Sequence, residues 1–138
     1  MKFLCTVTFL LSLASVAFAR EESILARVTS YWTGEGSNYA STGQRLRAGH
    51  CAVDPNRIPY GSKIIFADGV CTAVDTGPAV VNRKAARRCG RTASQLKAIV
   101  VDRFFETKRE AMAWTNAHPE FITLQIVPPG SHQDLTAP

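Results

Sequence analysis

The sequence predicts a single, mainly β domain, a small barrel or sandwich, interrupted by two helices. Three observations lead to this class. About six short apolar or alternating runs are separated by turn signals such as Asp68-Gly69. Two segments, 83–91 and 106–117, change to a helical pattern. Once a predicted leader is removed, 119 residues remain, which is enough for one hydrophobic core.

The chain begins with a predicted secretory signal peptide. Lys2 is followed by a long uncharged apolar run, and Ala17-Phe18-Ala19 forms an A-x-A cleavage site. Residues 1–19 are therefore expected to be removed, which predicts a secreted or periplasmic protein. A membrane anchor is disfavoured, because the run is short and ends on small residues.

The strands are predicted in order from alternation and from the residues that end each run. Residues 25–32 alternate between two faces, and 33–50 is a long loop rich in glycine, serine and threonine. Such length is typical of a functional loop. The strands are expected at 25–32, 51–54, 63–67, 70–75, 98–102 and 121–127. Residues 128–138 are predicted to form a disordered tail, so the domain is assigned to 20–127.

Charge and cysteine content narrow the classes of partner. Without Lys2 the chain has 15 basic and 11 acidic residues, a balance that suits an anionic extracellular polymer such as bacterial wall. Export argues against nucleic acid. Cys51, Cys71 and Cys89 allow one disulfide. Cys51–Cys71 is the favoured pair, and three buried thiols are the alternative. The scattered histidines and the absence of C-x-x-C disfavour a zinc site.

Three aspartates follow valine at the ends of predicted strands: Asp54, Asp75 and Asp102. Each could simply cap a turn, since Asp-Pro and Asp-Thr-Gly are good turn formers. The recurrence of one local pattern favours a shared site instead. Carboxylates that are desolvated and close together favour the protonated form of at least one of them, and a carboxyl group with a raised pKa suits the general acid of glycosidic bond cleavage.

The chain resembles the three-aspartate domain family of membrane-bound lytic transglycosylase A and the stationary-phase-survival muralytic proteins. The resemblance lies in "TSYW", "STGQ", "CAVDPNRIPYGSKIIF", "CTAVDTGPAV" and "VVDRFF…EAMAW…FITLQIV", in that order, over about 28–127. It implies a six-stranded double-psi β-barrel with one or two inserted helices. It also implies a lytic transglycosylase that cleaves peptidoglycan glycan strands between N-acetylmuramic acid and N-acetylglucosamine, as a monomer without cofactor or metal.

The resemblance also implies roles for individual residues. Asp102 matches the catalytic acid/base, and Asp75 and Asp54 match its two partners. The residues that match the substrate groove are Tyr31, Thr42, Gly43, Thr76 and Gly77. The chain departs from the family pattern at Pro78, which replaces a glycine, and in the 27 positions from Asp75 to Asp102.

Two other classes stay open. Asp75-Thr76-Gly77 is also the motif of aspartic proteases, which pair two such aspartates, although Pro78 fits that motif poorly. A non-catalytic barrel that binds wall polysaccharide could use the same fold. Trp114 is expected on the apolar face of its helix, packed in the hydrophobic core, rather than in a sugar site. Glu35 is a weak candidate for lining the groove.

The segment 83–91 carries a basic pattern. Lys84, Arg87, Arg88 and Arg91 are spaced to share one face of a single helix. Such a face is usually only solvated. Its functional interpretation is attraction to the acidic polymers of the wall, with the helix flanking the groove.

Overall fold

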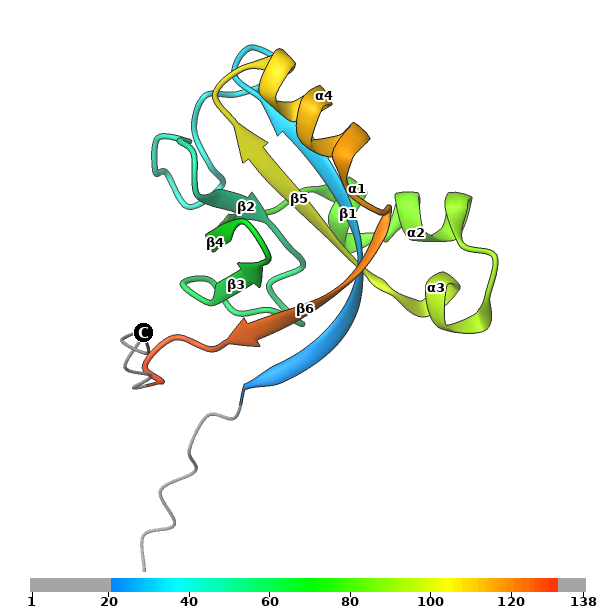
Figure 1. The fold of residues 1–138 in the computed structure, drawn as a ribbon. Helices are drawn as coiled ribbons and strands as arrows, with labels where there is room; N and C mark the ends of the chain where they lie inside the picture. The colour runs from blue at the N-terminus through cyan, green and yellow to red at the C-terminus, as the bar shows by residue number, and fades with distance from the viewer. Residues whose placement is uncertain (1–20, 132–138) are drawn as a thin grey trace, which may run out of the picture.

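The six strands close into a barrel (Figure 1). The computed structural model describes residues 21–131. The strands are β1 (Glu22–Trp32), β2 (His50–Ala52), β3 (Lys63–Phe66), β4 (Gly69–Asp75), β5 (Ile99–Phe105) and β6 (Phe121–Val127). Their order around the barrel is β1-β5-β2-β4-β3-β6, with β6 returning to β1. Two pairs, β1/β5 and β2/β4, are parallel, and the other four are antiparallel. The prediction of a six-stranded, mainly β barrel with inserted helices is confirmed.

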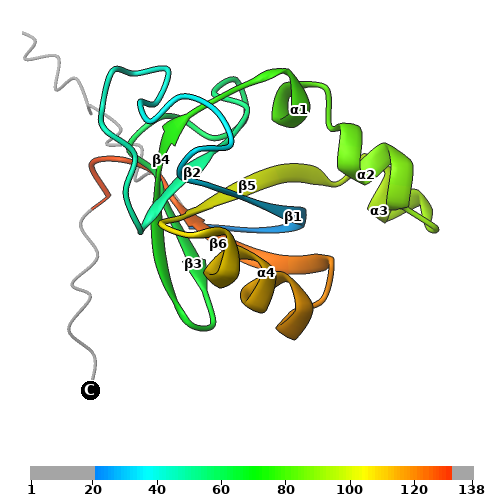
Figure 2. The same cartoon turned by 90° about the horizontal axis from the view of Figure 1, so that it is seen from above.

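The helices form two insertions. The first lies between β4 and β5 and contains α1 (Pro78–Val81), α2 (Lys84–Cys89) and α3 (Ala93–Lys97). The second, between β5 and β6, is α4 (Lys108–Ala117). Figure 2 shows the two insertions on opposite sides of the β1–β5 pair. A single basic helix was predicted for the first insertion. That prediction is wrong, because α2 ends at Cys89 and Arg91 lies beyond it.

The barrel interior is filled by small and branched apolar side chains. Its largest fully buried members are Ile64, Leu124, Val53, Val101, Cys51 and Cys71. A second apolar cluster lies outside the barrel, where Ala52 and Val100 pack against Val80 and Ala86 of the first insertion. One face of β2 and β5 therefore belongs to the barrel core, and the other is partly covered by helices.

The helix α4 packs against the barrel core through Trp114. The helix begins with a capping box in which Thr107 and Glu110 bond each other's backbone N–H groups. Trp114 is only 8 % exposed, which confirms its predicted core position. Its indole N–H donates to Asp68 at 3.1 Å, and Asp68 also pairs with Arg103 at 2.8 Å. These bonds tie α4 to the β3–β4 hairpin.

The predicted Cys51–Cys71 disulfide is wrong. Cys51, Cys71 and Cys89 are all free thiols, and the first two are buried. Cys51 pairs with Ala73 across β2 and β4, so Cys71 lies two residues further back along its strand. Strand spacing and rise then place the two Cα atoms about 8 Å apart, beyond the reach of a disulfide.

Candidate functional site

The barrel brings Asp75 and Asp102 together on either side of Ala52. Ala52 of β2 pairs with Asp102 of β5 on one side and with Asp75 of β4 on the other. Residues directly opposite each other on neighbouring strands project to the same face. Because alanine is small, both carboxylates line one open pocket of about 290 Å³ above it.

An irregularity in strand pairing places Asp75 on this face. Cys51 pairs with Ala73, but the next residue, Ala52, pairs with Asp75, so Val74 is passed over. Regular alternation would turn Asp75 to the same side as Ala73, which is buried in the barrel core. A one-residue bulge reverses the direction of the side chains that follow it. The bulge therefore turns the Asp75 carboxylate out of the core and toward Asp102.

Asp102 was predicted at the end of a strand, and that prediction is wrong. β5 continues through Phe105, and residues 103–105 stay paired with residues 30–32 of β1. Aromatic residues favour strands, and the rings of Phe104 and Tyr31 pack edge to face with centroids 5.2 Å apart. Asp102 therefore lies in the middle of a paired strand, where its carboxyl group is more desolvated than at a frayed end.

The surroundings of Asp102 favour its protonated form. Burial raises the pKa of Asp102 to about 6. The hydroxyl of Thr29, its partner on β1, donates to Oδ1 at 2.8 Å and opposes this rise. The negative charges of Glu35 and Asp75 add to it. Asp102 can therefore hold a proton near neutral pH and still release it, as a general acid/base requires.

Asp75 is held by three hydrogen-bond donors. Its Oδ1 accepts from the backbone N–H groups of Ser41 at 2.8 Å and Thr76 at 2.9 Å. Its Oδ2 accepts from the Tyr31 hydroxyl at 3.1 Å. Burial, together with the charge and hydrogen bond of Asp75, raises the pKa of Tyr31 well above its ordinary value, so the phenol keeps its proton and remains a donor. Asp75 is thus fixed in position, whereas Asp102 accepts a bond from the Thr29 side chain.

Of the predicted groove residues, Tyr31, Thr76 and Gly77 line the pocket. Thr42 and Gly43 are not among its lining residues. The Thr42 hydroxyl instead donates to the Val74 carbonyl at 2.7 Å. Gly43 adopts a positive φ of 88° in a tight turn. Thr42 therefore holds the 33–50 loop against β4, close to the bulge, and Gly43 allows the turn that follows it.

Asp54 does not line the pocket with the other two aspartates. Its Oδ1 accepts the backbone N–H of Asn56 at 3.0 Å, and its carbonyl accepts those of Arg57 and Ile58. This is the turn-forming role that Asp-Pro steps commonly have. The structure therefore brings two of the three aspartates together, and a part for Asp54 in tuning Asp102 stays a prediction.

Sequence reasoning missed Tyr39, which lines the pocket and is 58 % exposed. It lies in the 33–50 loop with Gly36 and Ser37, which form the same wall. On the other side, the wall comes from Ala79 and Val80 of α1. An aromatic residue in a loop of small polar residues was the available signal, because such a ring has little apolar surface nearby to bury it. The exposed ring of Tyr39 gives the pocket a flat apolar surface beside the two carboxylates.

Within residues 21–131, no group of three or more histidine, cysteine, aspartate or glutamate side chains is placed to hold a metal ion. No protein-family model matches this chain, and no curated protein matches its sequence. The family resemblance therefore stays a prediction, and the function has to be argued from the geometry of the site.

Proposed function

We propose that the protein is a lytic transglycosylase that cleaves the glycan strands of peptidoglycan. The observation that carries the proposal is Asp102, a desolvated carboxyl group with a pKa of about 6 in an open pocket beside a second carboxylate. A group with this pKa can donate a proton to a leaving oxygen and later accept one, both at near-neutral pH. The resemblance to the three-aspartate family supports the same reaction.

In the proposed reaction, Asp102 protonates the oxygen that links N-acetylmuramic acid to N-acetylglucosamine. The bond from that oxygen to the muramyl C1 breaks, and positive charge develops at C1 as in other glycosidic cleavages. The Asp102 carboxylate then takes the proton of the muramyl C6 hydroxyl, whose oxygen bonds to C1. The product is a 1,6-anhydro sugar, no water is consumed, and Asp102 ends protonated.

The other pocket residues have distinct parts in this proposal. Asp75, fixed by three donors, adds negative charge that helps to keep Asp102 protonated and would stabilise the positive charge at C1. Tyr39 would pack its exposed ring on a pyranose. Thr76 and Gly77, which directly follow β4, would contact the polymer. The partner is the glycan strand, and no nucleic acid is expected.

The proposed location is outside the cytoplasm, in the periplasm or the wall. It depends on the predicted signal peptide, which lies outside the described residues, as does most of the predicted tail. In the part of the chain that the structure describes, no helix has both the length and the apolar character needed to cross a membrane.

Product analysis tests the proposal. Purified peptidoglycan is incubated with the protein in H₂¹⁸O, and the soluble fragments are identified by mass spectrometry. We expect 1,6-anhydromuropeptides without ¹⁸O. Reducing ends that carry ¹⁸O would mean a hydrolase, and unchanged peptidoglycan that retains bound protein would mean a binding module. Cleavage of casein that pepstatin inhibits would support the aspartic protease instead.

A further inference from the structure

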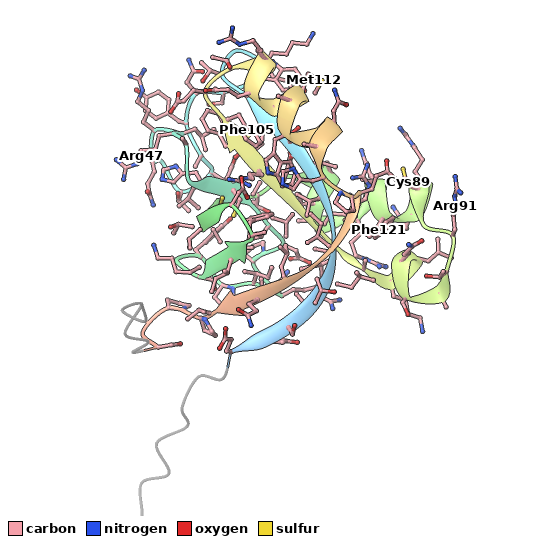
Figure 3. All side chains as sticks on the ribbon, in the orientation of Figure 1. Arg47, Cys89, Arg91, Phe105, Met112 and Phe121 are labelled. Carbon is pink, nitrogen blue, oxygen red and sulfur yellow. The ribbon has the colours of Figure 1, made fainter. Side chains whose placement is uncertain are left out.

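A second hollow lies on the first insertion and shares no lining residue with the carboxylate pocket. It measures about 460 Å³. Its lining residues are Arg88, Cys89, Gly90, Arg91, Gln95, Glu120 and Phe121. Figure 3 labels Cys89, Arg91 and Phe121 on this side of the molecule, with Arg91 at the outer end of the insertion. The same insertion therefore contributes α1 to the carboxylate pocket and the α2–α3 turn to this hollow.

The turn between α2 and α3 is closely packed at Gly90. A Cβ atom there would lie 2.7 Å from the Ala86 carbonyl oxygen and 2.9 Å from the Leu96 nitrogen. Such distances exclude any larger residue unless the backbone moves. The next residue, Arg91, donates its backbone N–H to the side-chain oxygen of Gln95 at 2.9 Å. The backbone that carries the two arginines of the hollow is thus fixed before any ligand arrives.

The charge of the hollow is positive. Its one acidic lining residue, Glu120, is paired with Arg27 of β1 at 3.1 Å. Arg88 and Arg91 are exposed. Neither arginine belongs to the Arg27–Glu120 or the Arg103–Asp68 salt bridge. The surrounding sequence reinforces this charge, because 76–101 contains six basic residues and no acidic one.

We propose that this hollow binds a carboxylate-bearing peptide. Guanidinium groups bind carboxylates through paired, charge-assisted hydrogen bonds. The half-buried ring of Phe121 on the other wall gives an apolar surface for a small side chain next to the carboxylate. A bare phosphate would use the arginines and leave this surface unused. Identification of the ligand as a peptide stem of the cell wall rests on the proposed function. The inference that the hollow binds a peptide carboxylate rests on its own residues and is independent of that function.

Binding to purified peptidoglycan tests the proposal. The full chain with Asp102→Asn is used, so that the polymer is not consumed, and bound protein is measured by sedimentation at increasing NaCl concentrations. Adding Arg88→Gln and Arg91→Gln should weaken binding at low salt by roughly tenfold, as expected for two exposed ion pairs. The difference should shrink at high salt. Arg57→Gln with Arg109→Gln removes the same charge from exposed positions elsewhere and should have little effect.

The outcomes separate the possible ligands. Conversion of the peptide carboxylates to amides should weaken binding of the Asp102→Asn protein to the level seen when Arg88→Gln and Arg91→Gln are added. Retained binding that inorganic polyphosphate displaces would instead identify phosphate as the ligand and overturn the peptide. Equal losses in the Arg57/Arg109 control, or no binding by any variant, would also overturn the proposal. Arginine-dependent binding by the Asp102→Asn protein, together with no anhydro products from the wild-type protein, would refute the transglycosylase alone.

Discussion

Asp102→Asn is predicted to stabilise the folded protein at neutral pH. In the folded state the pKa of Asp102 is raised from 3.8 to about 6, so keeping this carboxylate charged in its desolvated position costs free energy. Each unit of pKa difference corresponds to about 1.4 kcal/mol, which gives a cost of about 3 kcal/mol when Asp102 is fully ionised. Asparagine has the same size, can still accept the Thr29 hydrogen bond and carries no charge.

The sign of the pH dependence follows from the same shift. Well below the unfolded-state pKa of about 3.9 Asp102 is protonated in both states, and the substitution should change stability little. Between about pH 4 and 6 the folded protein keeps a proton that the unfolded chain has released, so the stability of the parent falls as pH rises. The gain from Asp102→Asn should therefore appear across this window and stay constant above it. Urea unfolding of both proteins from pH 4 to 8 measures the difference.

Asp68→Asn is predicted to change the stability of the folded protein in the opposite direction. Partial burial acts to raise the pKa of Asp68, but the hydrogen bond and charge of Arg103 outweigh it and hold the pKa below its ordinary value. Asp68→Asn should therefore destabilise the folded protein at any pH above the ordinary pKa of an aspartate. The loss should shrink as pH falls through the lowered pKa that Asp68 has in the folded state. A loss of stability at pH 7 in Asp102→Asn, or a gain independent of pH, would refute the burial argument for Asp102.

Three further predictions concern neighbouring features. Thr29→Val removes the bond that opposes burial and should raise the pKa of Asp102 by about one unit or more; an unchanged carboxyl titration by NMR would contradict this. Tyr39→Ala should raise KM for glycan roughly three- to tenfold with little change in kcat, whereas a large loss of kcat alone would argue against a sugar platform. Gly90→Ala should destabilise the protein by about 1–3 kcal/mol in urea unfolding, and Gly36→Ala, where a Cβ meets nothing within 4 Å, should not.

The barrel could be predicted because its strands carry strong local signals. β6 follows the expected 121–127 run, and β3 and β4 form the predicted hairpin, with Ala67 and Asp68 as its turn and Gly69 as the first residue of β4. The first insertion was harder to predict. Its basic residues have helical spacing, but Gly90 interrupts the helix for a reason visible only in three dimensions, the contact between α2 and α3.

The candidate site was predicted in part. The repeated Val-Asp step predicted that Asp75 and Asp102 share a site. It made the same prediction for Asp54, which the structure places elsewhere. The difference arises from register: the bulge opposite Cys51 and Ala52 turns Asp75 outward, whereas Asp54 lies beyond β2 in a turn. A bulge depends on the pairing of two strands and has no signature in either strand alone. The disulfide prediction failed for the same reason, since register separates Cys51 from Cys71.

The most direct test of the central claim is the rate of anhydromuropeptide release by the parent protein and by Asp102→Asn from pH 4 to 8. If Asp102 is the general acid, activity of the parent should fall as pH rises through about 6, where the acid loses its proton. Asp102→Asn should lose roughly 10²–10⁴-fold in rate while remaining folded. A fully active Asp102→Asn protein that releases the same anhydro products would contradict the assignment.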